Sequence, residues 1–202
     1  MQLAISMELY AYWNALRAGR NAPERNDIEP GAIRGILADT FVLDFDKEKG
    51  FPFRIAGSRA NALFLTELRG LSFLQLWREA DRQKVKSVIQ AVANESRPTL
   101  LCAEAEPSGL ESVQIETTLL PLRHHGSTHS RVLGCIAVKA VPQWLGLIGA
   151  GPARLISTSP LDSGKPPVAD GTPRGADRSF AGPKAQMWPG HFLFGRRNGH
   201  GA

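Results

Sequence analysis

The segment Val132–Val138, with the sequence VLGCIAV, is apolar at almost every position. A half-exposed strand alternates apolar and polar residues, whereas a strand that is covered on both faces lacks this alternation. We therefore expect this strand to lie in the centre of a sheet, between strands that come earlier in the chain. Both faces of that sheet must then be covered, by helices of the same chain or by a partner.

Four other segments have the composition or alternation of strands, and together with the central one they predict a five-stranded antiparallel sheet. A charged turn that ends in Gly50 joins the first two strands into a hairpin. The predicted strands, in chain order, are Phe41–Phe45, Phe53–Ala56, Thr99–Glu106, Ser112–Pro121 and Arg131–Lys139.

Two helices are predicted between the second and third strands. The segment from Ser58 to Leu68 has the spacing of a short helix, and Glu79–Glu95 has that of a longer amphipathic one. We expect both helices to cover the same face of the sheet. The sequence thus indicates an α+β fold with short helices and one longer helix on one face.

An amphipathic helix is also predicted at the N-terminus, where apolar residues recur on one side of a 3.6-residue period. Gly19 follows at the place of a C-terminal cap, and Pro30 is suited to the first turn of a second short helix that runs to Leu37. The apolar stripe must be buried on the chain's own sheet or on a second copy of the chain. We expect a homodimer whose interface includes this stripe: Ile5, Leu9, Tyr12, Trp13 and Leu16.

The 202 residues divide by composition into a helical cap at residues 1–38, a core at 39–141 and a tail at 142–202. The tail is rich in Pro, Gly, Ser and Asp and shows no helical or strand period, so we expect it to be disordered. Its end carries an apolar cluster, Trp188–Phe194, which is either a sticky terminus or a short docking motif.

Charge and hydropathy restrict the partners. The net charge is +5, but through Leu145 there are 17 Lys and Arg against 16 Asp and Glu, so most of the excess lies in the tail and nucleic acid is not an expected partner. The chain contains no apolar run of the roughly 18 to 20 residues that span a bilayer, and no secretory signal pattern. We expect a cytoplasmic protein without membrane contact, in which Cys102 and Cys135 are buried thiols.

The order of these elements resembles the PAS fold, and two passages carry the resemblance. In Gly70–Pro98, GLSFLQLWREADRQKVKSVIQAVANESRP, a glycine and a small polar residue precede an apolar turn and an acidic-Asp-Arg start to the long helix. The Tyr-Trp helix that ends in Arg17-Ala18-Gly19-Arg20 resembles a group of stand-alone bacterial PAS proteins. Phe53–Phe64 and Leu120–Leu122 also fit this group, and the resemblance covers roughly residues 7 to 140.

The resemblance implies a non-enzymatic sensory or regulatory module of bacterial signalling, which acts through protein contacts and dimerisation. The alternative is a small-molecule sensor that holds a hydrophobic ligand in the cavity between sheet and helices. The same side chains could instead fill that cavity as an ordinary core. The expected lining residues are Phe53, Ile55, Leu63, Phe64, Phe73, Trp77, Ile115 and Leu133.

No known cofactor or catalytic set is indicated. Haem-binding PAS domains usually supply a histidine from helices beside the cavity, but the histidines here lie in the loop before the last strand (His124, His125, His129) or in the tail. The segment before the long helix has no cysteine for a covalent flavin adduct, unless a strand thiol faces the cavity. Gly126 and Ser127 disfavour a helical metal site in the loop. We expect no metal, no catalytic residues and no cofactor beyond an unidentified hydrophobic molecule.

Overall fold

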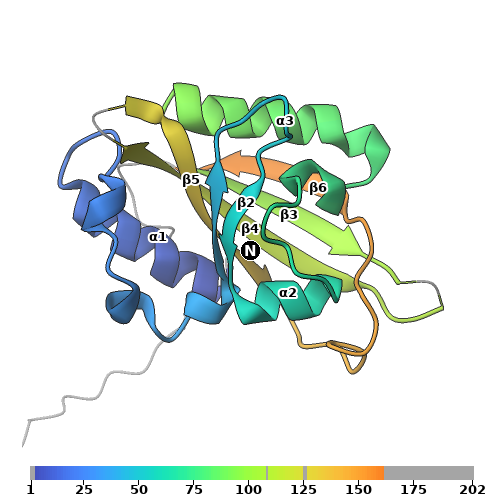
Figure 1. Cartoon of the computed structure of the whole chain (residues 1–202). Helices are drawn as coiled ribbons and strands as arrows, with labels where there is room; N and C mark the ends of the chain where they lie inside the picture. Colours follow the sequence, from blue (N-terminus) through green and yellow to red (C-terminus); the bar gives the residue numbers. More distant parts are fainter. Residues whose placement is uncertain (1–2, 108, 125–126, 162–202) are drawn as a thin grey trace, which may run out of the picture. The chain divides into compact units, whose positions relative to one another are not determined.

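The computed structural model describes residues 3–107, 109–124 and 127–161. The described chain forms one six-stranded antiparallel sheet in the order β2-β1-β5-β4-β3-β6, with helices on both faces (Figure 1). The strands are β1 Thr40–Asp44, β2 Phe53–Ala56, β3 Thr99–Ala105, β4 Val113–His124, β5 Ser127–Val138 and β6 Arg154–Pro160. The α-helices are α1 Ala4–Arg17, α2 Ser58–Phe64 and α3 Glu79–Asn94.

The position of β5 confirms the prediction made from VLGCIAV, because this strand lies between β1 and β4. Val132 and Ile136 belong to the core on one face of the sheet, and Leu133 and Cys135 belong to the core on the other. Gly134 lies where the strand is most tightly enclosed. A Cβ added there would meet Phe41 Cζ at 2.3 Å and the carbonyl oxygen of Thr118 at 2.5 Å.

The first core lies between the sheet and the helices α2 and α3, together with the 3₁₀ helix η4 at Phe73–Leu76. Its centre is aromatic: the ring centroids of Phe41 and Phe53 are 5.4 Å apart, and those of Phe73 and Trp77 are 5.8 Å apart. Aromatic pairs at these separations add to the free energy gained from burial alone. Val85, Ile89 and Val92 on the inner side of α3 complete this layer.

The second core lies under α1, which packs against β4 and β5 on the opposite face of the sheet (Figure 1). Three short 3₁₀ helices follow α1: η1 at Arg25–Asp27, η2 at Pro30–Ile33 and η3 at Leu37–Asp39. The single short helix predicted from Pro30 to Leu37 is therefore replaced by separate turns. Ile33 and Ile36 from these turns are buried beside α1.

The burial of α1 corrects the predicted role of its apolar stripe. The side chains of Leu9 and Trp13 are 0% exposed and pack on the chain's own sheet, so they have no surface left for a second copy. Trp13 Nε1 donates a hydrogen bond to the carbonyl oxygen of Pro121 at 2.8 Å, which completes this attachment. The other predicted interface residues, Ile5, Tyr12 and Leu16, remain partly exposed.

The folded part continues beyond the boundary predicted at residue 141. Residues 142–161 form a loop and the strand β6, which pairs with β3, and Trp144, Ala153 and Leu155 are buried in the first core. An edge strand needs only backbone pairing and one inward side chain, so its sequence can be as polar as RLISTSP. For this reason the polar composition of β6 led to its assignment to the tail. The predicted disorder of residues 162–202 and the Trp188–Phe194 cluster lie outside the described residues.

Replacing Trp13 should test the attachment of α1. We expect Trp13→Ala to lower the free energy of unfolding by about 3 to 5 kcal/mol, because a large buried side chain leaves a cavity. Trp13→Phe is the matched control: it keeps a ring but leaves the Pro121 carbonyl without its donor, at a cost of about 1 to 3 kcal/mol. Urea unfolding gives both values. Unchanged stability with a loss of dimers in Trp13→Ala would instead support a role in dimerisation.

Truncation should show where the folded unit ends. A chain that stops at Val141 lacks β6 and the buried Trp144, so we expect it to aggregate or to unfold at a clearly lower temperature. A chain of residues 1–166, which form a compact unit, should keep the melting temperature of the full chain. Differential scanning calorimetry of the three proteins makes the comparison, and a stable chain ending at Val141 would show that β6 is dispensable.

Candidate functional site

The interior predicted as a ligand cavity is almost completely filled. Phe53, Leu63, Phe73, Trp77 and Ile115 are buried together in the first core, and Phe64 packs partly buried against them. The void that remains has a volume of about 10 Å³ and is bordered by Phe64, Phe73, Leu76, Trp77, Ala103, Ile115, Thr117, Ile136 and Ala153. A space of this size is at the lower limit for one water molecule.

Two of the predicted lining residues do not face this interior. Ile55 is 50% exposed, because a β-bulge at Arg54 pairs Phe53 with Leu43 but Ile55 with Val42. The extra residue places Phe53 and Ile55 on opposite faces of the sheet, although they are two positions apart. Leu133 belongs to the second core under α1, because side chains alternate along β5.

One of the residues that border the interior void has a buried polar group without a partner. Trp77 is 2% exposed, and within the described part of the chain its indole Nε1 makes no hydrogen bond. The hydroxyl-bearing Thr117 of β4 borders the same void. An unpaired buried N–H costs free energy, so its occurrence at this position calls for a functional explanation.

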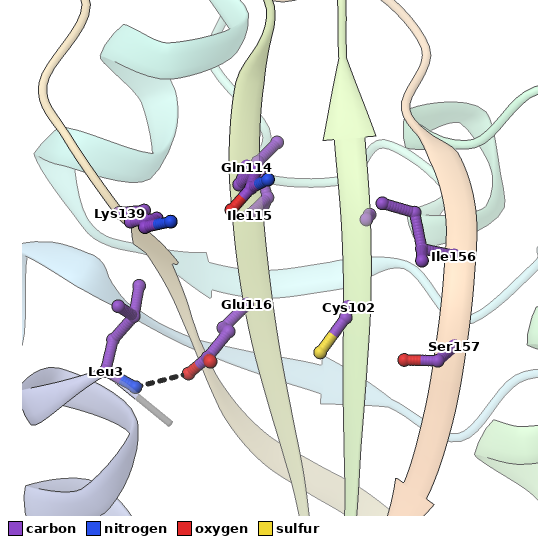
Figure 2. Close-up of a pocket in the computed structure, with 9 residues that line it drawn as sticks. Leu3, Cys102, Gln114, Ile115, Glu116, Lys139, Ile156 and Ser157 are labelled. Carbon is purple, nitrogen blue, oxygen red and sulfur yellow. Dashed lines mark hydrogen bonds between the residues drawn. The ribbon is translucent and has the colours of Figure 1, made fainter. Parts of the chain in front are cut away.

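A second hollow lies on the opposite face of the sheet, beyond the start of α1 (Figure 2). It has a volume of about 270 Å³ and is formed by strands β3, β4 and β6 together with the N-terminal end of α1. We call it the outer-face groove; its lining residues are Leu3, Cys102, Ala103, Gln114, Ile115, Glu116, Lys139, Ile156 and Ser157.

Glu116 connects this groove to α1. Glu116 is only 6% exposed, and its Oε2 accepts a hydrogen bond from the backbone N–H of Leu3 at 2.5 Å (Figure 2). Leu3 is the N-cap of α1 and provides no side-chain cap of its own. A carboxylate here satisfies a helix N–H and faces the positive end of the helix dipole. Sequence reasoning missed this contact, and the only available signal was a glutamate inside an otherwise buried strand.

The two cysteines are free thiols in different environments, and neither borders the interior void. Cys102 is partly exposed and lines the outer-face groove. Cys135 is buried under α1, and burial raises the pKa of its thiol to about 11, opposed in part by the nearby Thr118 and Ser6. Cys135 is therefore an unreactive thiol at neutral pH, and neither thiol is placed to attack a flavin inside the core.

The described residues offer neither a metal-binding cluster nor a membrane-spanning helix. In the part of the chain that the structure describes, no group of three or more His, Cys, Asp or Glu is placed to hold a metal ion. The side chains of His124, His125 and His129 are not among those described. Among the described helices, none is both long and apolar enough to cross a bilayer.

Comparison with known proteins places the fold in a family. A family model described as "PAS domain" matches residues 1–137, a range that includes α1 and β5 but ends before β6. Among solved structures, the chain is similar to the LOV protein of Rhodobacter sphaeroides, with 12% identity and a TM-score of 0.42. That match covers 51% of this chain and 60% of the LOV protein.

No curated protein gives a significant match to the chain. The finer resemblance to stand-alone PAS proteins with a Tyr-Trp helix and an Arg-x-Gly-Arg turn stays a prediction. The family model, however, covers well over half of the 202 residues and includes the strands β1 to β4 and nearly all of β5. The chain therefore belongs to the PAS domain family, whose members are generally sensory modules.

Proposed function

We propose that the chain is a non-enzymatic regulatory PAS module of cytoplasmic signalling, which acts through protein contacts and homodimerisation on its outer-face groove. One observation carries this proposal. The interior has only about 10 Å³ of free space, whereas the outer face of the sheet has an open groove of about 270 Å³ beside the start of α1. The surface is thus better suited than the interior to receive a partner.

The chemistry of the groove suits a protein partner. Ile156 of β6 is 50% exposed, and Leu3 and Cys102 add partly exposed apolar surface elsewhere in the groove. Helix α1 covers the part of this face formed by β4 and β5, but β3 and β6 extend beyond it. Apolar side chains at the centre of such a patch with polar residues at its edge are typical of protein interfaces.

The groove also supports a regulatory role because it includes an attachment point of α1. The Glu116 carboxylate, which accepts the Leu3 N–H, forms part of the groove wall (Figure 2). A partner that reaches this carboxylate competes with the helix for it. Binding would therefore alter how firmly α1 is held on the sheet.

Catalysis has little support in the same groove. Within the described residues, Cys102 makes no hydrogen bond to a general base, and the Glu116 carboxylate is engaged by a backbone N–H. A nucleophile needs a base within hydrogen-bond reach. The groove is better explained as a contact surface.

Self-association should depend on Ile156. We expect the wild-type protein to sediment as a dimer and Ile156→Glu to sediment as a monomer, because a charge that replaces an apolar side chain within an interface is costly to bury. Leu147→Glu is the matched control, since Leu147 is 75% exposed and does not line the groove. Sedimentation velocity makes the measurement. A monomeric wild type, or a dimer that tolerates Ile156→Glu, contradicts the proposed interface.

A small-molecule sensor is the second candidate, and it is favoured by the unpaired Nε1 of Trp77, a residue that borders the void. A small hydrophobic ligand with a carbonyl or carboxylate oxygen would give this N–H an acceptor. Side chains around the void would have to move to admit anything larger than water. The ligand would thus be coupled to the packing of the first core.

Native mass spectrometry should separate the two candidates. If the interior binds a ligand, a copurified mass should accompany the wild-type protein and be about five- to tenfold less abundant in Trp77→Phe, because one hydrogen bond is lost. Trp144→Phe is the control, since Nε1 of Trp144 already donates to the carbonyl oxygen of Glu111 at 3.1 Å. A wild-type mass equal to the bare polypeptide counts against the sensor.

A further inference from the structure

A third hollow lies at the opposite edge of the sheet from β6, beside the terminal strand β2. Its volume is about 800 Å³, and it shares no lining residue with the outer-face groove or the interior void. We call it the β2 groove; it is lined by Arg25, Asp44, Lys49, Pro52, Phe53, Arg54, Ile55, Ala56, Glu67, Arg69 and Gly70.

The β2 groove carries an excess of positive charge. Four of its residues are cationic and two are acidic, although the chain through Leu145 is close to neutral, with 17 basic and 16 acidic residues. Within the described chain, the guanidinium groups of Arg25 and Arg69 make no ion pair. These two cations are available to a partner.

The acidic residues of the groove are already engaged by the protein. Asp44 lies 3.7 Å from Arg54 Nη1 and 3.4 Å from Arg131 Nε, so two cations face one carboxylate. Glu67 accepts hydrogen bonds from Asn61 Nδ2 at 3.1 Å and from the backbone N–H of Arg69 at 3.2 Å. The charge that the groove presents to a partner is therefore positive.

The outer backbone edge of β2 and the exposed side chain of Ile55 define how an extended partner chain would lie in the groove. β2 is the last strand on this side of the sheet. Among the described residues, its outer edge makes backbone hydrogen bonds only at Phe53, with Leu71 at 2.9 Å and Gly70 at 2.7 Å. The stretch Arg54–Ala56 pairs with β1 and has no other described strand on its outer side. The bulge at Arg54 turns Ile55 outward, where it is 50% exposed among the cations.

We propose that the β2 groove binds an extended acidic segment of a partner protein. The segment would lie along Arg54–Ala56 as an added strand, with an aliphatic side chain on Ile55 and carboxylates directed at Arg25 and Arg69. Strand addition supplies main-chain hydrogen bonds, and alternate side chains supply specificity. Charge complementarity would speed the encounter and select against basic partners. A bare polyanion would use the cations but would leave Ile55 and the open edge unused.

Fluorescence anisotropy with a defined probe tests the proposal. The probe is a labelled eight-residue peptide in which Glu and Val alternate, and the control peptide alternates Lys and Val. We expect the full-length protein to bind the acidic peptide, more weakly as salt rises. Arg25→Glu/Arg69→Glu should weaken binding about tenfold or more, since two attractive contacts become repulsive. Lys84→Glu/Lys86→Glu on α3 changes the net charge equally and should leave binding unchanged.

A second substitution separates a peptide site from a site for anions. Ile55→Asn should weaken the affinity for the acidic peptide about threefold to tenfold, because it removes the apolar contact, and should not change the affinity for inorganic tripolyphosphate.

Circular dichroism confirms that each variant is folded, and Arg25→Gln/Arg69→Gln replaces the charge reversal if that variant does not fold. The proposal is overturned if the wild type does not bind the acidic peptide, or if it binds the basic peptide equally well. It also fails if Arg25→Glu/Arg69→Glu and Lys84→Glu/Lys86→Glu weaken binding of the acidic peptide equally. A third contrary result is that Ile55→Asn leaves the affinity for this peptide unchanged while tripolyphosphate displaces it.

Discussion

The enclosure of β5 on both faces is the constraint on which the rest of the structure depends. Val132 and Ile136 enter the core under α2 and α3, while Leu133 and Cys135 enter the core under α1. A strand with apolar residues on both sides cannot leave either face in water without losing the free energy gained from burial. The sheet therefore needs two covering layers, and Gly134 allows its centre to pack closely enough to hold both.

The two layers are not equally complete. The inner layer is closed by aromatic rings down to a void of about 10 Å³. The outer layer consists of α1 and the short turns that follow it. Helix α1 reaches β4 and β5 but leaves the side of β3 and β6 open as the outer-face groove. This asymmetry leaves partly exposed apolar side chains, such as Ile156, in the groove beside the start of α1. Any partner that completes the outer layer would contact the end of α1 that Glu116 holds.

The sequence predicted those features that follow from periodicity. The alternation along the strands, the double-sided burial of β5 and the burial of the Trp13 stripe all depend on regular spacing, and the PAS resemblance then indicated the order of the strands. Two features were not predicted because they depend on irregular or long-range contacts: the bulge at Arg54 reversed the face of Ile55, and the polar edge strand β6 had the composition of a tail. Leu133 was assigned to the wrong face for another reason: in a strand that is apolar on both sides, the sequence does not show which face each residue joins.

The outer layer also contains polar groups that weaken it. The hydroxyls of Ser6 on α1 and Thr118 on β4 are buried, and the polar group beside both of them is the thiol of Cys135. A thiol is a weak acceptor, so each hydroxyl keeps much of a desolvation cost of about 1 to 3 kcal/mol. The Trp13 indole and the Glu116 carboxylate offset that cost through their hydrogen bonds to Pro121 and Leu3. Because one of these two attachments lies in the wall of the outer-face groove, a ligand or partner there acts directly on the attachment of α1 to the sheet.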